Sequence, residues 1–79
     1  MKIFTVGSKS FVTSFQFAGI PGIITETPDE ALVEITKLTD DSDVGLVLVS
    51  DDITSSINDE LTALRAEKST LVFALPAAG

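Results

Sequence analysis

The stretch that decides the fold is residues 27–50, TPDEALVEITKLTDDSDVGLVLVS. It begins with Thr27 as an N-cap, Pro28 at the first helical position and Glu30 at the third, where the threonine hydroxyl and the glutamate carboxylate can each satisfy a free backbone N–H. Apolar residues at helical spacing follow, then an acidic loop. Residues 44–49 are an unbroken apolar run, which is typical of a parallel strand covered on both faces. A capped helix leading into such a strand indicates an α/β fold.

The same alternation continues on both sides of this stretch. Ser55, Ser56 and Asn58 are weak helix formers, so the last helix should have an irregular first turn. Right-handed crossovers then predict one domain over residues 1–79, an open parallel four-stranded sheet of flavodoxin-like (Rossmann-like) order 2-1-3-4 with helices on both faces. Besides residues 44–49, strands are expected at 2–6, 23–25 and 70–75, and helices at 8–18, from 28 onward and from 50 onward.

Composition excludes several classes of function. The chain has 79 residues, no cysteine, and twelve carboxylates against five scattered basic groups, giving a net charge of −7. This charge disfavours binding to nucleic acids and to anionic membranes. No apolar run approaches the roughly 18 residues of a membrane span, and the N-terminus has no secretory pattern. These features predict a cytoplasmic protein without direct membrane insertion.

The missing residue types narrow the possible chemistry. The chain has no His, Cys, Trp or Tyr. A Ser-His-Asp relay, a thiol nucleophile and a His- or Cys-based zinc site are therefore impossible within it. Acid–base catalysis would depend on carboxylates or lysines alone. We therefore expect a protein that is not an enzyme, with no catalytic residue.

Ligands of such folds bind where the order of the strands reverses, here between the loops at residues 7–10 and 50–52. Asp51 or Asp52 could accept a phosphoryl group, but no acidic residue follows the first strand and there is no fifth strand. Gly7 lacks the further glycines of a dinucleotide-binding loop. The acidic loop at 40–43 is out of register with a calcium motif. We therefore expect no cofactor and no metal.

Apolar residues are in surplus around the first helix. Phe11 and Phe15 share a helix face, whereas Phe17 points well away from it. Three isoleucines follow in the next segment, beside an expected edge strand. This surplus predicts a surface that binds a protein partner and permits weak self-association. The predicted docking residues are Phe17, Ile20, Ile23 and Ile24.

Five segments, taken together, point to a known family. Residues 2–7 (KIFTVG), 11–20 (FVTSFQFAGI), 27–31 (TPDEA), 44–53 (VGLVLVSDDI) and 71–76 (LVFALP) resemble the F subunit of the V-type and archaeal A-type rotary ATPases (ATP synthases) across essentially the whole chain. The resemblance implies a rotor protein of the central stalk in a proton- or sodium-translocating ATPase or ATP synthase. In that family, the F subunit docks on the coiled-coil D subunit, binds no nucleotide and is peripheral on the membrane within the complex. Family members usually continue into a C-terminal helical segment, and the resemblance predicts that this chain, with residues 76–79 (PAAG) after its last strand, lacks that segment.

Two other interpretations are compatible with the same fold. One is a receiver-like signalling or interaction module that cannot be phosphorylated. The other is a small ligand-binding domain or enzyme of flavodoxin type. A response of Asp51 or Asp52 to acetyl phosphate and Mg²⁺ would favour the first, and tight flavin or nucleotide binding would favour the second. The stalk role predicts neither response, and predicts instead that the protein co-purifies with a long helical hairpin.

Overall fold

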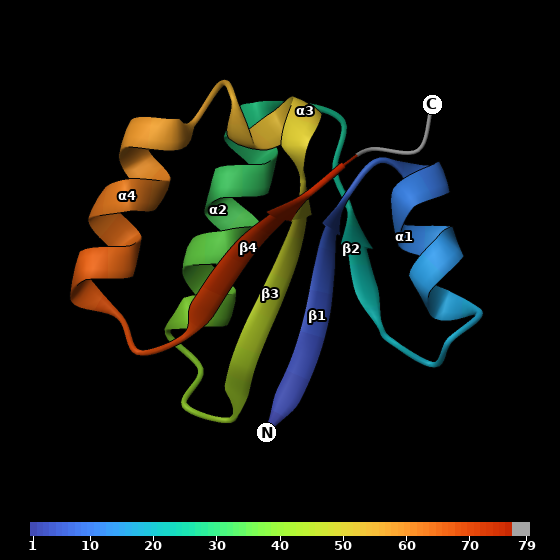
Figure 1. The fold of residues 1–79 in the computed structure, drawn as a ribbon, viewed down its shortest axis with the longest axis horizontal. Helices are drawn as coiled ribbons and strands as arrows, with labels where there is room; N and C mark the ends of the chain where they lie inside the picture. Colours follow the sequence, from blue (N-terminus) through green and yellow to red (C-terminus); the bar gives the residue numbers. More distant parts are fainter. Residues whose placement is uncertain (77–79) are drawn as a thin grey trace.

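The computed structural model describes residues 1–76; residues 77–79, the end of the single domain expected over the chain, lie outside the described residues. The sheet within the described part is parallel throughout and has the order β2-β1-β3-β4, which confirms the predicted topology. The elements, coloured along the chain in Figure 1, are β1 (Lys2–Gly7), α1 (Lys9–Gln16), β2 (Gly22–Ile24), α2 (Pro28–Thr39), β3 (Val44–Ser50), α3 (Asp51–Thr54), α4 (Asn58–Glu67) and β4 (Leu71–Leu75).

The main core lies on one face of the sheet. Alternate side chains of β1, β3 and β4 point to this face and pack against α2, α3 and α4. The fully or nearly fully buried members are Val6, Ala31, Ile35, Val44, Val47, Val49, Ile53, Ile57, Leu61 and Val72. Because side chains alternate along a strand, the intervening residues point to the opposite face. There α1 buries Phe11 and Val12 against β1 and β2.

The helix starts follow from local sequence. Thr27 caps α2 as expected, because its hydroxyl oxygen accepts a hydrogen bond from the Glu30 amide at 3.1 Å. The glutamate acts differently from the prediction: its carboxylate accepts from the Thr27 hydroxyl at 3.2 Å instead of from a backbone N–H. Ser8 caps α1 in the same way as Thr27 caps α2, through the Phe11 amide. Gly19, with φ of 83°, turns the chain after α1.

The expected last helix is divided in two, which goes beyond the irregular first turn that was predicted. The hydroxyls of Thr54 and Ser55 donate to the carbonyls of Asp51 and Asp52, at 3.1 and 3.2 Å. Such bonds compete with continued helical pairing. Ile57 then adopts φ −124° and ψ 26° before α4 begins. The division still leaves Ile57 inside the core.

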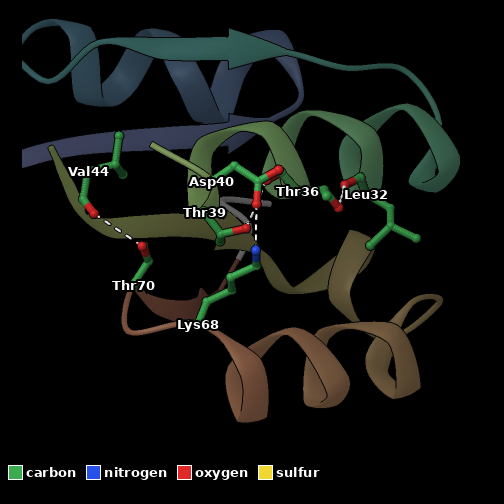
Figure 2. A network of polar contacts seen from close by, with 7 residues as sticks. All are labelled: Leu32, Thr36, Thr39, Asp40, Val44, Lys68 and Thr70. Carbon is green, nitrogen blue, oxygen red and sulfur yellow. Dashed lines mark hydrogen bonds and ion pairs between the residues drawn. The ribbon is translucent and has the colours of Figure 1, made fainter. Parts of the chain in front are cut away.

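Polar contacts close the amino end of the sheet (Figure 2). The Thr70 hydroxyl donates to the Val44 carbonyl at 3.1 Å, which joins the start of β4 to β3. The Lys68 ammonium donates to the Asp40 carboxylate at 2.5 Å, which joins the end of α4 to the end of α2. Within α2, the hydroxyls of Thr36 and Thr39 donate to carbonyls of the preceding turn. These contacts hold α4 and β4 against the rest of the fold.

Candidate docking surfaces

The point where the strand order reverses lies between the ends of β1 and β3. Gly7 ends β1 there, and the Phe11 ring and the Ser50 hydroxyl stand directly beside it. A Cβ added to Gly7 would lie 2.9 Å from Phe11 Cδ2 and 3.0 Å from Ser50 Oγ. Both Gly7 and Ser50 are buried. The protein's own side chains therefore fill the space beside this strand end.

The acidic residues considered for phosphoryl transfer lie at a helix start. Asp51 and Asp52 form the first turn of α3, where carboxylates interact favourably with the helix dipole. Ser50 precedes them as N-cap residue, without a capping bond from its side chain. Within residues 1–76, no three or more carboxylates come together in a group able to hold a metal ion. The acidic loop at 40–43 instead supplies Asp40 to the ion pair with Lys68.

The four predicted docking residues all lie near the β2 edge of the sheet, but they do not form one patch. Phe17, the C-cap residue of α1, is 89% exposed, and Ile24 is 52% exposed. Ile20 is half-buried in a hollow at the amino end of β1. Ile23, also half-buried, shares with Ile24 a second hollow beside α2. Ile23 and Ile24 are thus brought together, whereas Phe17 and Ile20 lie apart from them.

The structure also has an apolar surface that the sequence analysis did not predict. The strand at 44–49 was expected to be covered on both faces, and this is wrong for one face, where Leu46 and Leu48 are only half-buried. Their partners on β4, Leu71 and Phe73, are 56% and 52% exposed. We call these four residues, Leu46, Leu48, Leu71 and Phe73, the bare face.

The bare face exists because α2, α3 and α4 pack on the other face of the sheet, which leaves α1 alone on this side among the described residues. The helix α1 packs on β1 and β2, and no helix of the described chain stands in front of β3 and β4 in Figure 1. Residues 71–75 are apolar without interruption, so the sequence contains no alternation of polar and apolar residues that could have indicated a half-covered strand.

Charge is distributed unequally between the two sides of the sheet. All twelve side-chain carboxylates lie between residues 26 and 67, in α2, α3, α4 and the segments next to them. The four strands and α1 contain none. Lys68, at the end of α4, has a pKa raised above 10.5, first by its hydrogen bond to Asp40 and then by the charge of that carboxylate.

In the described part of the chain, no helix is long and apolar enough to cross a membrane.

Comparisons with known proteins agree with the resemblance of the sequence to the F subunit of rotary ATPases. The family model for the ATP synthase (F/14-kDa) subunit matches residues 3–79. The A-type ATP synthase F subunit of Methanococcoides burtonii is 42% identical over 52 residues, which are 66% of this chain and 52% of that protein. The A-type ATP synthase F subunit of Methanocorpusculum labreanum is 46% identical over 55 residues, covering 67% of this chain and 55% of the relative.

A third relative, the A-type ATP synthase F subunit of Methanococcus maripaludis, is 27% identical over 66 residues, covering 82% of this chain and 67% of that protein. The alignments with the first two relatives span about half of their length. The family match, by contrast, covers nearly every residue of the present chain. Together with the parallel sheet of order β2-β1-β3-β4, it shows that the chain belongs to the family of the ATP synthase (F/14-kDa) subunit.

Proposed function

We propose that the protein is the central-stalk F subunit of a proton- or sodium-translocating A-type or V-type ATPase, and that it docks on the coiled-coil D subunit. The observation that carries this proposal is the match of the family model for the ATP synthase (F/14-kDa) subunit to residues 3–79. In this role the protein turns with the shaft and is peripheral on the membrane, within the cytoplasmic part of the complex. It acts through its outer surface alone.

The surface proposed to contact the D subunit is the β2 edge, with Phe17, Ile20, Ile23 and Ile24. Two of these side chains are largely available to a partner, since Phe17 is 89% and Ile24 52% exposed. Large exposed apolar side chains are the usual anchors of helical partners. Ile24 is the last residue of β2, a short edge strand of three residues that offers little backbone for pairing, and Phe17 lies at the end of α1.

A role without covalent chemistry is supported by the strand ends. Phe11 and Ser50 pack so closely on Gly7 that even one methyl group would meet them at about 3 Å. Ligands of parallel α/β sheets normally bind at this position. A nucleotide or flavin would have to displace a buried aromatic ring to enter. The proposal therefore assigns catalysis to other proteins of the complex.

Binding to the purified D subunit of the same complex tests the proposal. Phe17→Ser and Ile24→Ser should each raise the Kd for this partner about tenfold or more, as expected for interface anchors. Their thermal stability should change little, because both side chains are largely exposed in the free protein. Ala63→Ser, at an exposed position of α4 on the other side of the molecule, serves as control and should bind like the unmodified protein.

Each result has a clear reading. If the unmodified protein forms no complex with the D subunit, the stalk role is wrong. If it binds and neither serine variant weakens the complex, the role stands but the docking surface is wrong. Incubation with acetyl phosphate and Mg²⁺ tests the proposal that the protein performs no covalent chemistry. Phosphorylation of Asp51 or Asp52 would contradict that proposal.

A further inference from the structure

The outer edge of β4 is the longer of the two edges of the sheet. In the order β2-β1-β3-β4, each end strand pairs with a neighbour on one side only. The β2 edge has three residues, Gly22–Ile24, whereas the β4 edge has five, Leu71–Leu75. An edge strand presents backbone N–H and C=O groups with which a strand of another molecule can pair, and a very short strand limits this pairing. The edge that depends on another form of protection is therefore β4.

The composition of β4 favours pairing with a further strand. Residues 70–75 (TLVFAL) contain no charge, glycine or proline, and Thr, Val and Phe favour extended strands. Leu71, Phe73 and Ala74 are exposed in the folded protein. Short, uncharged segments of this kind form intermolecular sheets in which identical side chains stack on one another. The expected partner of an open β4 edge is therefore the same segment of a second copy of the chain.

One side chain already contacts this edge. Arg65, in the last turn of α4, donates from Nε to the Val72 carbonyl oxygen at 3.1 Å. Because alternate residues of a strand turn their backbone groups to the same side, Val72 and Ala74 supply the outward groups of β4. A strand added to β4 would have to pair with the Val72 carbonyl and would meet the arginine there. A hydrogen bond from a guanidinium is stronger than one from a neutral N–H, so the added strand competes poorly for this oxygen.

The surrounding structure holds Arg65 in this position. Leu61 and Leu64, in the same helix, pack on the core, and Lys68 is ion-paired with Asp40 at the end of α2. These contacts fix the end of α4 beside β4. Within residues 1–76, Arg65 itself makes no ion pair, so no carboxylate of this part of the chain draws its guanidinium away from the strand.

We infer that Arg65 protects the β4 edge, keeping this strand from pairing with residues 70–75 of a second copy of the chain. It does so by occupying the Val72 carbonyl and by lying where the added strand would have to lie. The inference concerns the β4 edge alone, and it depends neither on the surface at the β2 edge nor on the proposed stalk role.

Arg65→Met tests the inference on the whole chain, because methionine keeps an apolar stem of similar kind but has no donor. With agitation at neutral pH and without denaturant, this variant should form thioflavin T-positive assemblies after a lag time at least about threefold shorter than that of the unmodified protein. Circular dichroism and urea unfolding verify that the variant is folded under these conditions. Lys68→Met is the matched control, since it removes one positive charge and one contact of α4 but leaves the Val72 carbonyl occupied. Its lag time should equal that of the unmodified protein.

A second change on the same edge separates edge protection from a loss of stability. Ala74→Lys, added to Arg65→Met, places a charge at an exposed position of β4, and charges on edge strands prevent pairing. The lag time should then return to that of the unmodified protein, although the lysine does not restore the contact between α4 and β4. Any one of three results overturns the inference: an unchanged lag time in Arg65→Met, an equal shortening in Lys68→Met, or a shortening that persists in the double variant.

Discussion

Thr25 and Thr70 are buried to nearly the same extent, with 5% and 6% of their surface exposed, yet their hydroxyls have different surroundings. Thr70 precedes β4 and donates to the Val44 carbonyl. Thr25 follows β2, and its Oγ1 makes no hydrogen bond within the described residues. A buried hydroxyl without a partner costs roughly 1–3 kcal/mol, whereas a typical paired one contributes about 1 kcal/mol to stability. The two threonines are therefore matched in burial and differ in whether the hydroxyl is hydrogen-bonded.

Substitution by valine, which has the shape of threonine, should shift stability in opposite directions. Thr70→Val should lower the free energy of unfolding by about 1 kcal/mol, because it removes the bond to Val44. Thr25→Val should raise it by about 1 kcal/mol, because it removes an unpaired buried hydroxyl. Urea unfolding with an unchanged m-value measures both effects. A loss of stability in Thr25→Val would show that this hydroxyl has a partner in solution.

Among the elements, α1 is held on the sheet by a close backbone approach. Gly22 of β2 lies against Thr5 and Val12, so that an added Cβ would overlap Thr5 Oγ1 and lie 2.6 Å from Val12 Cγ1. Both neighbours are fully buried and have no room to move. Gly45 of β3 is similarly crowded, but only by the side chain of Met1, which is 92% exposed. The two glycines thus differ in what surrounds them.

Alanine at these two glycines should have unequal effects. Gly22→Ala should destabilise the protein by about 1–3 kcal/mol, the usual cost of forcing a methyl group into a packed core. Gly45→Ala should change stability by less than about 0.5 kcal/mol, since the flexible Met1 side chain can rotate away. Thermal unfolding compares the two variants. Equal losses of stability in the two variants would mean that the cost comes from placing alanine in the strand backbone, and not from the close packing of α1 on Gly22.

For the whole molecule, the ion pair between Lys68 and Asp40 joins segments that are distant in sequence. It connects the end of α4 to the end of α2 (Figure 2), and both side chains reach solvent. The pKa of Lys68 is raised by this contact above its ordinary value of 10.5. A lysine whose pKa is higher in the folded state contributes stability below its unfolded pKa and loses it as the pH rises through the folded value.

The stability of the unmodified protein relative to Lys68→Met should therefore fall in the alkaline range. The difference in free energy of unfolding should be constant at neutral pH and decrease as the pH rises past 10.5. Lys37→Met removes the same charge at an exposed position, where the nearest carboxylate is 3.6 Å away, and serves as control. Chemical unfolding at a series of pH values measures both. A difference that instead grows above pH 10.5 would contradict the assigned direction of the shift.

The sequence by itself determined the order of the elements, the parallel topology and the family. Thr27, Pro28 and Glu30 mark a helix start through contacts within one turn, and the apolar run at 44–49 marks a strand through its own composition. Helical spacing also predicted that Phe17 points away from the face of Phe11, and in the structure Phe11 is buried and Phe17 exposed. Signals of this kind are local, so a single sequence contains them.

Only the tertiary structure decided which strand faces are covered and where exposed apolar residues gather. Leu46 and Val47 are adjacent and similar in character, but one faces the bare side and the other the core beneath α2. The packing also separated the predicted docking residues: Ile23 and Ile24 share a hollow beside α2, whereas Ile20 lies in a different hollow at the amino end of β1. Whether a strand face is buried depends on which side of the sheet each crossover helix packs and over which strands it lies, and this placement is a property of the packed layers and not of the strand itself.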